Sequence, residues 1–199
     1  DGVHGLELWK TDGTVPGTVL VKDINPGSAD GSPWKFAVHQ NVLYFAANDG
    51  VNGMELWRSD GTDAGTYLVK DILPGAAGSD PLQLVSNGNL LFFTANDGTS
   101  GPEVWISDGT TNGTQLVTDL YPGNSTFYPP AGLTPFGNSL FYIGFEDVLT
   151  GEELYITDGT AAGTGLVADI FPGGFASDIS HMLVAGGLLW FQADNSTNG

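Results

Sequence analysis

The stretch Glu55-Leu56-Trp57-Arg58-Ser59-Asp60-Gly61-Thr62 decides the fold, because it occurs four times along the chain with small changes. The other copies begin at Glu7, Glu103 and Glu153, so successive copies lie 48, 48 and 50 residues apart. A repeat of this length with several short β-rich runs is typical of propeller blades, whereas helical repeats show a 3.6-residue periodicity. The sequence therefore predicts an all-β protein built from repeated sheets.

Each repeat predicts four strands, which in the second copy span about 54–59, 66–72, 82–86 and 90–95. Residues 86–89 read Ser-Asn-Gly-Asn, and Asn-Gly favours a tight hairpin because both residues accept positive φ. Residues 60–65 suit a longer hairpin, and Pro74-Gly75 ends the outer strand. Since Leu56 and Trp57 point to opposite sides of one strand, both faces of each sheet must be buried.

The chain starts with two predicted strands, within 6–24, and finishes with two more, within 179–193. We expect these halves to form one blade together, giving a four-bladed β-propeller with two-plus-two closure and no exposed sheet edge. The chain would then be a single domain, 1–199, with repeat units at about 1–48, 49–96, 97–146 and 147–194, and 195–199 beginning a further unit. Two alternatives are a piece of a longer array and half-blades that pair with neighbouring molecules.

The four motif copies resemble the ELWxxDGT repeat family of predicted bacterial surface and secreted proteins. The likeness covers essentially the whole chain; the third copy departs from the pattern at Val104 and the fourth at Tyr155. The strand pattern is also loosely similar to kelch blades. This resemblance implies a propeller and a secreted, extracellular or cell-surface location, and it implies no particular reaction.

The chain carries 23 acidic residues and only five Lys and Arg, for a net charge of −18. All five basic residues lie within 1–70, and residues 71–199 contain fourteen acids and no Lys or Arg. Such a surface repels phosphate backbones and anionic lipids, so we expect no nucleic-acid partner. No apolar stretch approaches the roughly 20 residues of a membrane helix, so we expect no membrane insertion.

Fourfold repetition of acids argues for a structural role, because an active site breaks symmetry. Three acids per repeat are expected at one rim, near glycine-rich loops whose carbonyl oxygens are suitable ligands for Ca²⁺. The candidate calcium ligands are Asp49, Glu55, Asp71, Asp97, Glu103, Asp119, Asp147, Glu153 and Asp169. The alternative is that the aspartates cap turns and that the glutamates bind a neighbouring strand or water.

A specific ligand site is expected where the repeats differ. The residues that break the pattern are aromatic or acidic: Trp34, Phe127, Tyr128, Phe145, Glu146 and Phe175. Aromatic faces beside carboxylates can hold sugars, so a glycan or surface polymer is the candidate ligand. The alternative is that these aromatic side chains fill gaps between blades.

These patterns predict a non-enzymatic extracellular binding or scaffold module, with calcium as the expected stabilising ion and no catalytic residue. One alternative is an assembly subunit that builds a surface ring or fibre by self-association through half-blade pairing. Another is a carbohydrate-active enzyme that uses two carboxylates, such as Glu146 and Glu152.

Overall fold

The computed structural model describes residues 2–123, 129–147 and 149–195. This part of the chain is all-β and consists of sixteen strands joined by turns and loops. None of it forms a helix of the length and apolar character required to cross a membrane. The predicted fold class, all-β with repeated sheets, is confirmed.

The strands form three four-stranded antiparallel sheets flanked by two two-stranded sheets, and in every sheet the strands pair in chain order. The first sheet contains β3 (Trp34–His39), β4 (Val42–Asn48), β5 (Met54–Ser59) and β6 (Tyr67–Lys70). The second contains β7 (Leu82–Ser86), β8 (Leu91–Asn96), β9 (Pro102–Ser107) and β10 (Gln115–Leu116). The third contains β11 (Ala131–Phe136), β12 (Ser139–Phe145), β13 (Glu152–Thr157) and β14 (Gly165–Ala168).

The two-stranded sheets lie at the ends of the chain. We call β1 (Leu8–Lys10) with β2 (Val19–Lys22) the N-terminal half-sheet, and β15 (Ser180–Ala185) with β16 (Leu188–Gln192) the C-terminal half-sheet. By repeat position, β1 and β2 correspond to the third and fourth strands of a full sheet, and β15 and β16 to the first and second.

The core lies between sheets rather than on one side of them, as the adjacent Leu and Trp of the motif predict. One cluster, which includes Phe45 and Trp57, joins the N-terminal half-sheet to the first sheet. A second joins the first sheet to the second, and a third, which includes Tyr142 and Tyr155, joins the second to the third. The first and second sheets thus bury both of their faces against their neighbours.

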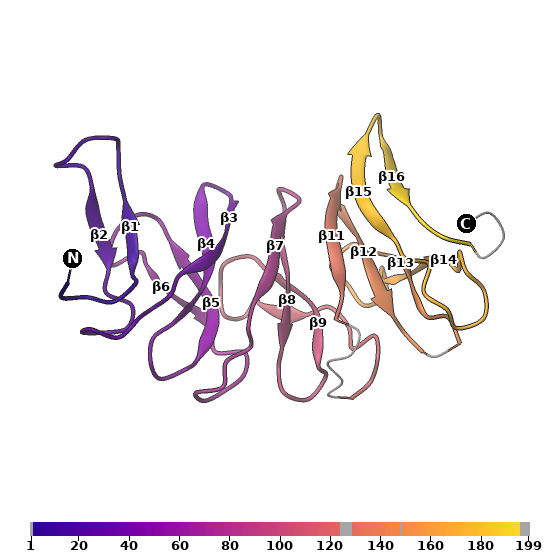
Figure 1. The fold of residues 1–199 in the computed structure, drawn as a ribbon, viewed down its shortest axis with the longest axis horizontal. Coiled ribbons are helices and arrows are strands. Elements are labelled where there is room, and N and C mark those ends of the chain that lie inside the picture. The colour runs from indigo at the N-terminus through magenta and orange to yellow at the C-terminus, as the bar shows by residue number, and fades with distance from the viewer. Residues whose placement is uncertain (1, 124–128, 148, 196–199) are drawn as a thin grey trace.

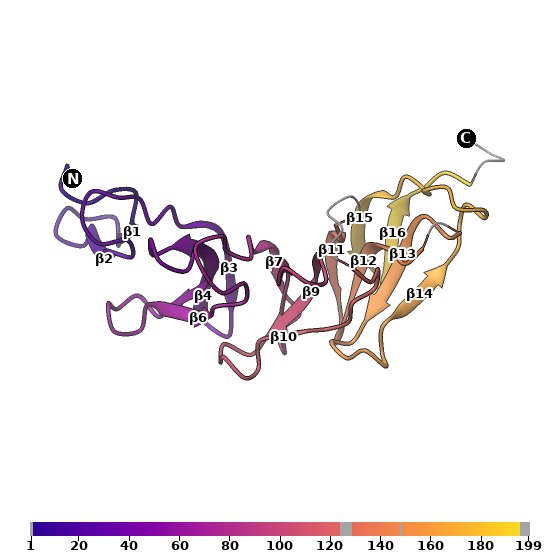
Figure 2. The ribbon, with the colours of Figure 1, turned by 90° about the horizontal axis from the view of Figure 1, so that it is seen from below.

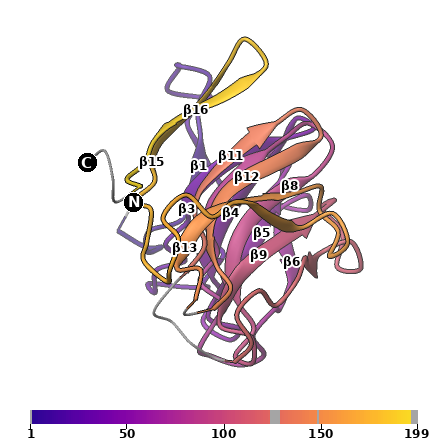
Figure 3. The same ribbon diagram turned by 90° about the vertical axis from the view of Figure 1, so that its right-hand side faces the viewer.

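The first strands of successive sheets, β3, β7, β11 and β15, lie beside one another, as inner strands of a propeller do. The sheets stand in a row in Figure 1, and the view along that row in Figure 3 shows them stacked behind one another. Figure 2 shows the same row from below as an open, elongated arrangement.

The expected two-plus-two closure is not formed in this structure. β1 pairs with β2 and β15 with β16 in two separate sheets, and the half-sheets lie at opposite ends of the row. A four-membered ring requires each sheet to turn a quarter of a circle from the previous one. Here the sheets stand in a row, with large side chains such as Phe93, Trp105 and Tyr142 packed between neighbours, and β1 and β16 do not meet.

The same backbone irregularity occurs in β3, β7, β11 and β15. Lys35, Gln83, Gly132 and His181 occupy equivalent positions and have φ of 56°, 53°, 64° and 57°. Each lies inside a register shift of the first hairpin, which identifies a repeated β-bulge. Only the third copy has glycine there, so the other three side chains occupy a left-handed conformation that is unfavourable for them.

We predict that Lys35→Gly is more stable than Lys35→Ala by about 1 kcal/mol, because alanine keeps a Cβ in the left-handed conformation and glycine does not. Both variants lose the Lys35 ammonium above the Trp34 ring, so that contact cancels in the comparison. Urea unfolding of the two variants measures the difference. Equal midpoints would show that the bulge carries no such cost.

Candidate functional site

The motif glutamate is a buried hydrogen-bond acceptor that fixes the loop leading to the next sheet. Glu55, which is fully buried at the start of β5, accepts bonds from the Leu73 N–H at 3.0 Å and the Ser79 N–H at 3.0 Å. The Ser79 hydroxyl donates to its other oxygen at 2.6 Å. Because residues 73–79 lie in the connection between the first and second sheets, this carboxylate connects one repeat to the next.

The other copies repeat the arrangement. Glu7 accepts from the backbone N–H groups of Ile24, Asn25 and Gly31 at 2.7, 3.2 and 2.8 Å. Glu153 accepts from those of the adjacent residues Ile170 and Phe171 at 3.1 and 3.3 Å.

Glu103 is a buried hydrogen-bond acceptor with a strongly raised pKa. It accepts a hydrogen bond from the Tyr121 N–H at 3.4 Å. Burial raises the pKa of Glu103 to about 8, and the nearby charges of Asp119 and Asp97 act in the same direction. Burial also raises the pKa of Glu55, although the hydrogen bonds from Ser79 oppose that effect.

The aspartates of the loop between the second and third strands cap turns. Asp49 accepts from the N–H groups of Val51 and Asn52 at 2.9 and 2.8 Å. Burial raises the pKa of this carboxyl, but the hydrogen bonds from Asn52 and Val51 outweigh burial and leave it lowered. Asp97 and Asp147 hold their turns in the same way. This is the geometry of the turn-cap alternative.

The aspartates after the fourth strand behave differently from one copy to the next. One oxygen of Asp71 is buried and has no hydrogen-bond partner in the described part of the chain. Asp119 and Asp169 are exposed. The candidate calcium ligands therefore divide between buried acceptors, turn caps and exposed carboxylates. Across residues 2–123, 129–147 and 149–195, no three acidic or histidine side chains are grouped closely enough to hold a metal ion.

The Asp-Gly-Thr turns at the other end of the sheets carry a second repeated network. Asp60 accepts from both the N–H and the hydroxyl of Thr62, at 2.9 and 2.7 Å. The Thr62 hydroxyl in turn accepts from the Gly65 N–H at 2.9 Å. The hydroxyl bond, followed by the backbone bond, lowers the pKa of Asp60. The same bonds are present at Asp12, Asp108 and Asp158.

The symmetry-breaking residues do not form a single site. Trp34 begins β3 in the first sheet, whereas Phe145 ends β12 in the third sheet (Figure 1). Phe127 and Tyr128 lie outside the described residues. Phe175 follows the third sheet, and its backbone lies against Gly151, just before β13.

Around the start of β13 the structure does bring several of the predicted residues together. Phe145 is buried, faces Glu152 across the sheet and packs edge-on against Tyr121 with ring centroids 4.9 Å apart. The Tyr155 hydroxyl donates to Glu146 at 3.2 Å.

Phe175 is mostly exposed and packs on Phe171 at 5.1 Å between ring centroids. We call Tyr121, Phe145, Glu146, Phe171 and Phe175 the third-sheet rim. The buried Phe145 fills a gap, as the alternative for the aromatic residues expects, while Phe175 and Glu146 remain accessible.

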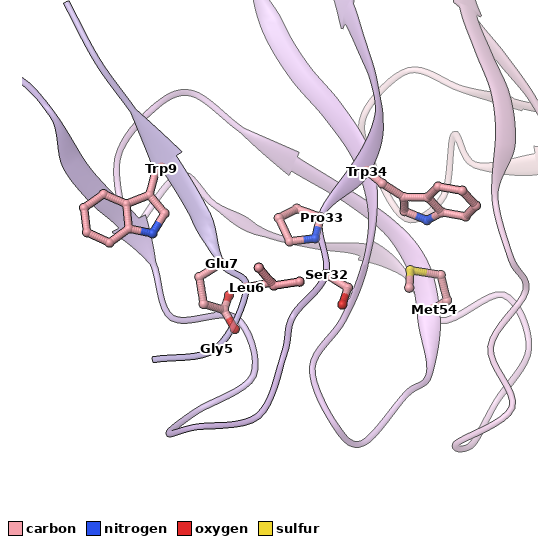
Figure 4. A pocket seen from close by; sticks show the side chains of 8 residues that line it. All are labelled: Gly5, Leu6, Glu7, Trp9, Ser32, Pro33, Trp34 and Met54. Carbon is pink, nitrogen blue, oxygen red and sulfur yellow. The ribbon is translucent and has the colours of Figure 1, made fainter. Parts of the chain in front are cut away.

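Trp34 instead lines a cavity of about 590 Å³ between the N-terminal half-sheet and the first sheet. Figure 4 shows Trp9 and Trp34 on opposite sides of this cavity, with Leu6 and Pro33 between them. The wall is mainly apolar, and Glu7, its acidic member, already accepts three backbone hydrogen bonds. This cavity was not predicted from the sequence, because it depends on which strands lie beside β1.

No model of a known protein family matches the chain, and no curated protein matches it. The fold and the site geometry therefore define the chain as an all-β protein of stacked antiparallel sheets linked by buried glutamates.

We predict that the free energy of unfolding decreases as the pH rises from about 5 to about 8. The pKa of Glu103 is about 8 when folded and has an ordinary value of 4.5. Its contribution is therefore fully present below the unfolded pKa and is lost as pH rises through the folded one. Glu103→Gln removes the ionisation, so urea unfolding at several pH values should give a flatter profile for this variant. An unchanged profile would show that Glu103 does not titrate in this range.

Proposed function

We propose that the chain is a non-enzymatic extracellular or cell-surface module that serves as a scaffold and presents a binding surface. The observation that carries the proposal is the use of the repeated carboxylates. In each copy the glutamate accepts hydrogen bonds from the backbone of the next connection, so the strongest acidic pattern in the sequence is used to hold the fold. The secreted location and the propeller-type arrangement, as an open or larger ring, are supported by the resemblance to the ELWxxDGT repeats.

The third-sheet rim is the surface we propose for a glycan or surface polymer. Phe175 offers an exposed ring, and Glu146 offers a carboxylate for sugar hydroxyls. The chain would bind such a ligand without cleaving it, because Glu146 is held by the Tyr155 hydroxyl and Glu152 lies opposite Phe145 within the sheet pairing. A glycosidase requires two carboxyl groups that flank the bond to be cut.

We predict saturable binding to at least one member of a polysaccharide panel without release of reducing sugar. Affinity electrophoresis measures binding, and a reducing-end assay measures cleavage. Phe175→Ala should weaken binding about tenfold, since one stacking ring is lost. The matched control is Leu149→Ala, another exposed apolar residue in a neighbouring loop. Sugar release that stops in Glu146→Gln would establish the enzyme alternative instead, and a flat panel would remove the glycan partner.

We propose calcium binding only at the exposed carboxylates. Glu55 would have to release three donors to bind a cation, whereas Asp119 and Asp169 are exposed. We predict that millimolar calcium raises the melting temperature and that Asp119→Asn with Asp169→Asn removes the rise, because a ligand of the folded state stabilises it. Magnesium is the control. A melting temperature that does not respond to calcium would remove the ion from the proposal.

A further inference from the structure

A buried histidine lies between the first and second sheets. We call the contact between these two sheets the first joint, and the contact between the second and third sheets the second joint. His39, at the end of β3, is 1% exposed, and its Nδ1 lies 2.8 Å from the hydroxyl oxygen of Ser86 on β7. Its Nε2 is also buried and has no hydrogen-bond partner within the described part of the chain. Both sheets of this joint are complete and have a neighbouring sheet on each side.

His39 breaks the repeat. The equivalent residues, which also precede the turn between the first two strands, are Asn87 in the second sheet and Phe136 in the third. The hydroxyl partner has no counterpart either, because Ser86 corresponds by register to Pro135 at the second joint. An ionisable ring with a hydroxyl partner is therefore specific to the first joint.

Other polar groups surround His39 at this place. The Tyr44 ring on β4 lies edge-on to the imidazole, with 6.0 Å between ring centroids. The Arg58 guanidinium on β5 lies over the rings of Tyr44 and Tyr67, at 5.9 and 5.3 Å from their centroids. It also donates a hydrogen bond to the Gly109 carbonyl of the second sheet at 3.4 Å, so polar side chains connect the two sheets here.

The second joint is apolar at the same place. The equivalents of Tyr44 and Arg58 are Phe92 and Ile106, and both lie against Gly159 of the third sheet. A change of pH therefore has groups to act on at this end of the first joint, and the corresponding end of the second joint offers apolar side chains instead.

The surroundings of His39 disfavour its charged form. Asp108, in the turn after β9, attracts a positive charge at His39, but it is exposed and already accepts two hydrogen bonds from Thr110. Arg58 is itself a cation, β7 contains no ionisable residue, and Lys35 lies at the other end of β3. Burial lowers the pKa of His39, and the charge of Asp108 opposes burial only in part.

We propose that the first joint is an acid-sensitive hinge, in which protonation of His39 loosens the packing of β3 against β7 while the second joint stays closed. A protonated imidazole needs an acceptor at each nitrogen, and here Nε2 has none among the described residues, so opening of the joint to water favours the charged form. This inference goes beyond the proposed scaffold function, because a scaffold needs no response to pH.

The lowered pKa gives the direction of the response. The ordinary pKa of His39 is 6.5, and the closed joint binds the proton less tightly than the open one. The stability of the joint is therefore fully present above this value and is lost as the pH falls below it. At about pH 5.5, one unit lower, the open state gains up to about tenfold in population relative to the closed state.

Thiol labelling tests the hinge, since the chain contains no cysteine of its own. Leu84→Cys places a thiol in the core of the first joint, and Leu133→Cys places one at the equivalent position of the second joint. Leu84 and Leu133 are only 9% and 7% exposed, so a dithiodipyridine reagent reaches either thiol when its joint opens.

Each labelling rate is divided by the rate of the same thiol in a chain that also carries His39→Asn, measured at the same pH. This ratio cancels the effect of pH on the thiol and the titration of Glu103, which both chains keep. We expect the ratio for Leu84→Cys to rise up to about tenfold from about pH 7.5 to about pH 5.5, and the ratio for Leu133→Cys to stay constant. His39→Phe, the residue of the third sheet, is a second uncharged replacement and should give the same result.

Two results would overturn the proposal. A ratio for Leu84→Cys that does not change with pH would show that His39 does not control the joint. Equal rises for both thiols would show that acid unfolds the whole row of sheets rather than one joint. The matched control is His181→Asn, which removes an exposed histidine and should leave the labelling of both thiols as it is in the chain with His181.

Discussion

In all four copies of the motif, the glutamate side chain accepts hydrogen bonds from the backbone of the connection to the next sheet. That connection pairs with a strand only briefly, as at the bridge between Gly78 and Met54, and its other N–H groups would be costly to bury unpaired. Glu55 supplies acceptors to both ends of one connection, at Leu73 and Ser79. The position of the second sheet relative to the first therefore depends on this side chain as much as on the apolar core between them.

A second constraint on the fold, besides the glutamates, is that the sheets have two apolar faces. Leu56 and Trp57 are adjacent and both are buried, which is possible only when a sheet has neighbours on both sides. In a stack of such sheets the interior sheets bury both apolar faces, and the outermost strands keep apolar side chains exposed. Trp9 and Trp190 are exposed, whereas Trp57 and Tyr44, at the equivalent positions of the first sheet, are buried by neighbouring sheets.

The sequence predicted the strands well because their signals are local. Asn87-Gly88 and the repeated motif around Trp57 placed strands at 82–86 and 54–59, and the structure has Leu82–Ser86 and Met54–Ser59. The repeated bulge was missed because Lys35 and Gln83 are not residues that indicate positive φ. The expected ring closure is not formed, since β1 and β2 form a sheet separate from β15 and β16, and strand patterns within a repeat carry no information on the angle between neighbouring sheets.

The candidate site shows why a repeated acid is ambiguous in a sequence. A carboxylate that binds calcium and one that accepts backbone hydrogen bonds both need oxygen lone pairs and glycine-rich neighbours. The two roles differ in whether backbone N–H groups already donate hydrogen bonds to the carboxylate oxygens. At Asp49 the donors come from its own turn, two and three residues ahead, and at Glu55 they come from 18 and 24 residues ahead. The first pattern is local enough to be recognised in a sequence, whereas the second appears only once the sheets are stacked. The motif glutamates and the turn-capping aspartates are therefore already bound by the fold itself, and the proposed ligands reach residues that break the repeat, such as Phe175, or the exposed Asp119 and Asp169.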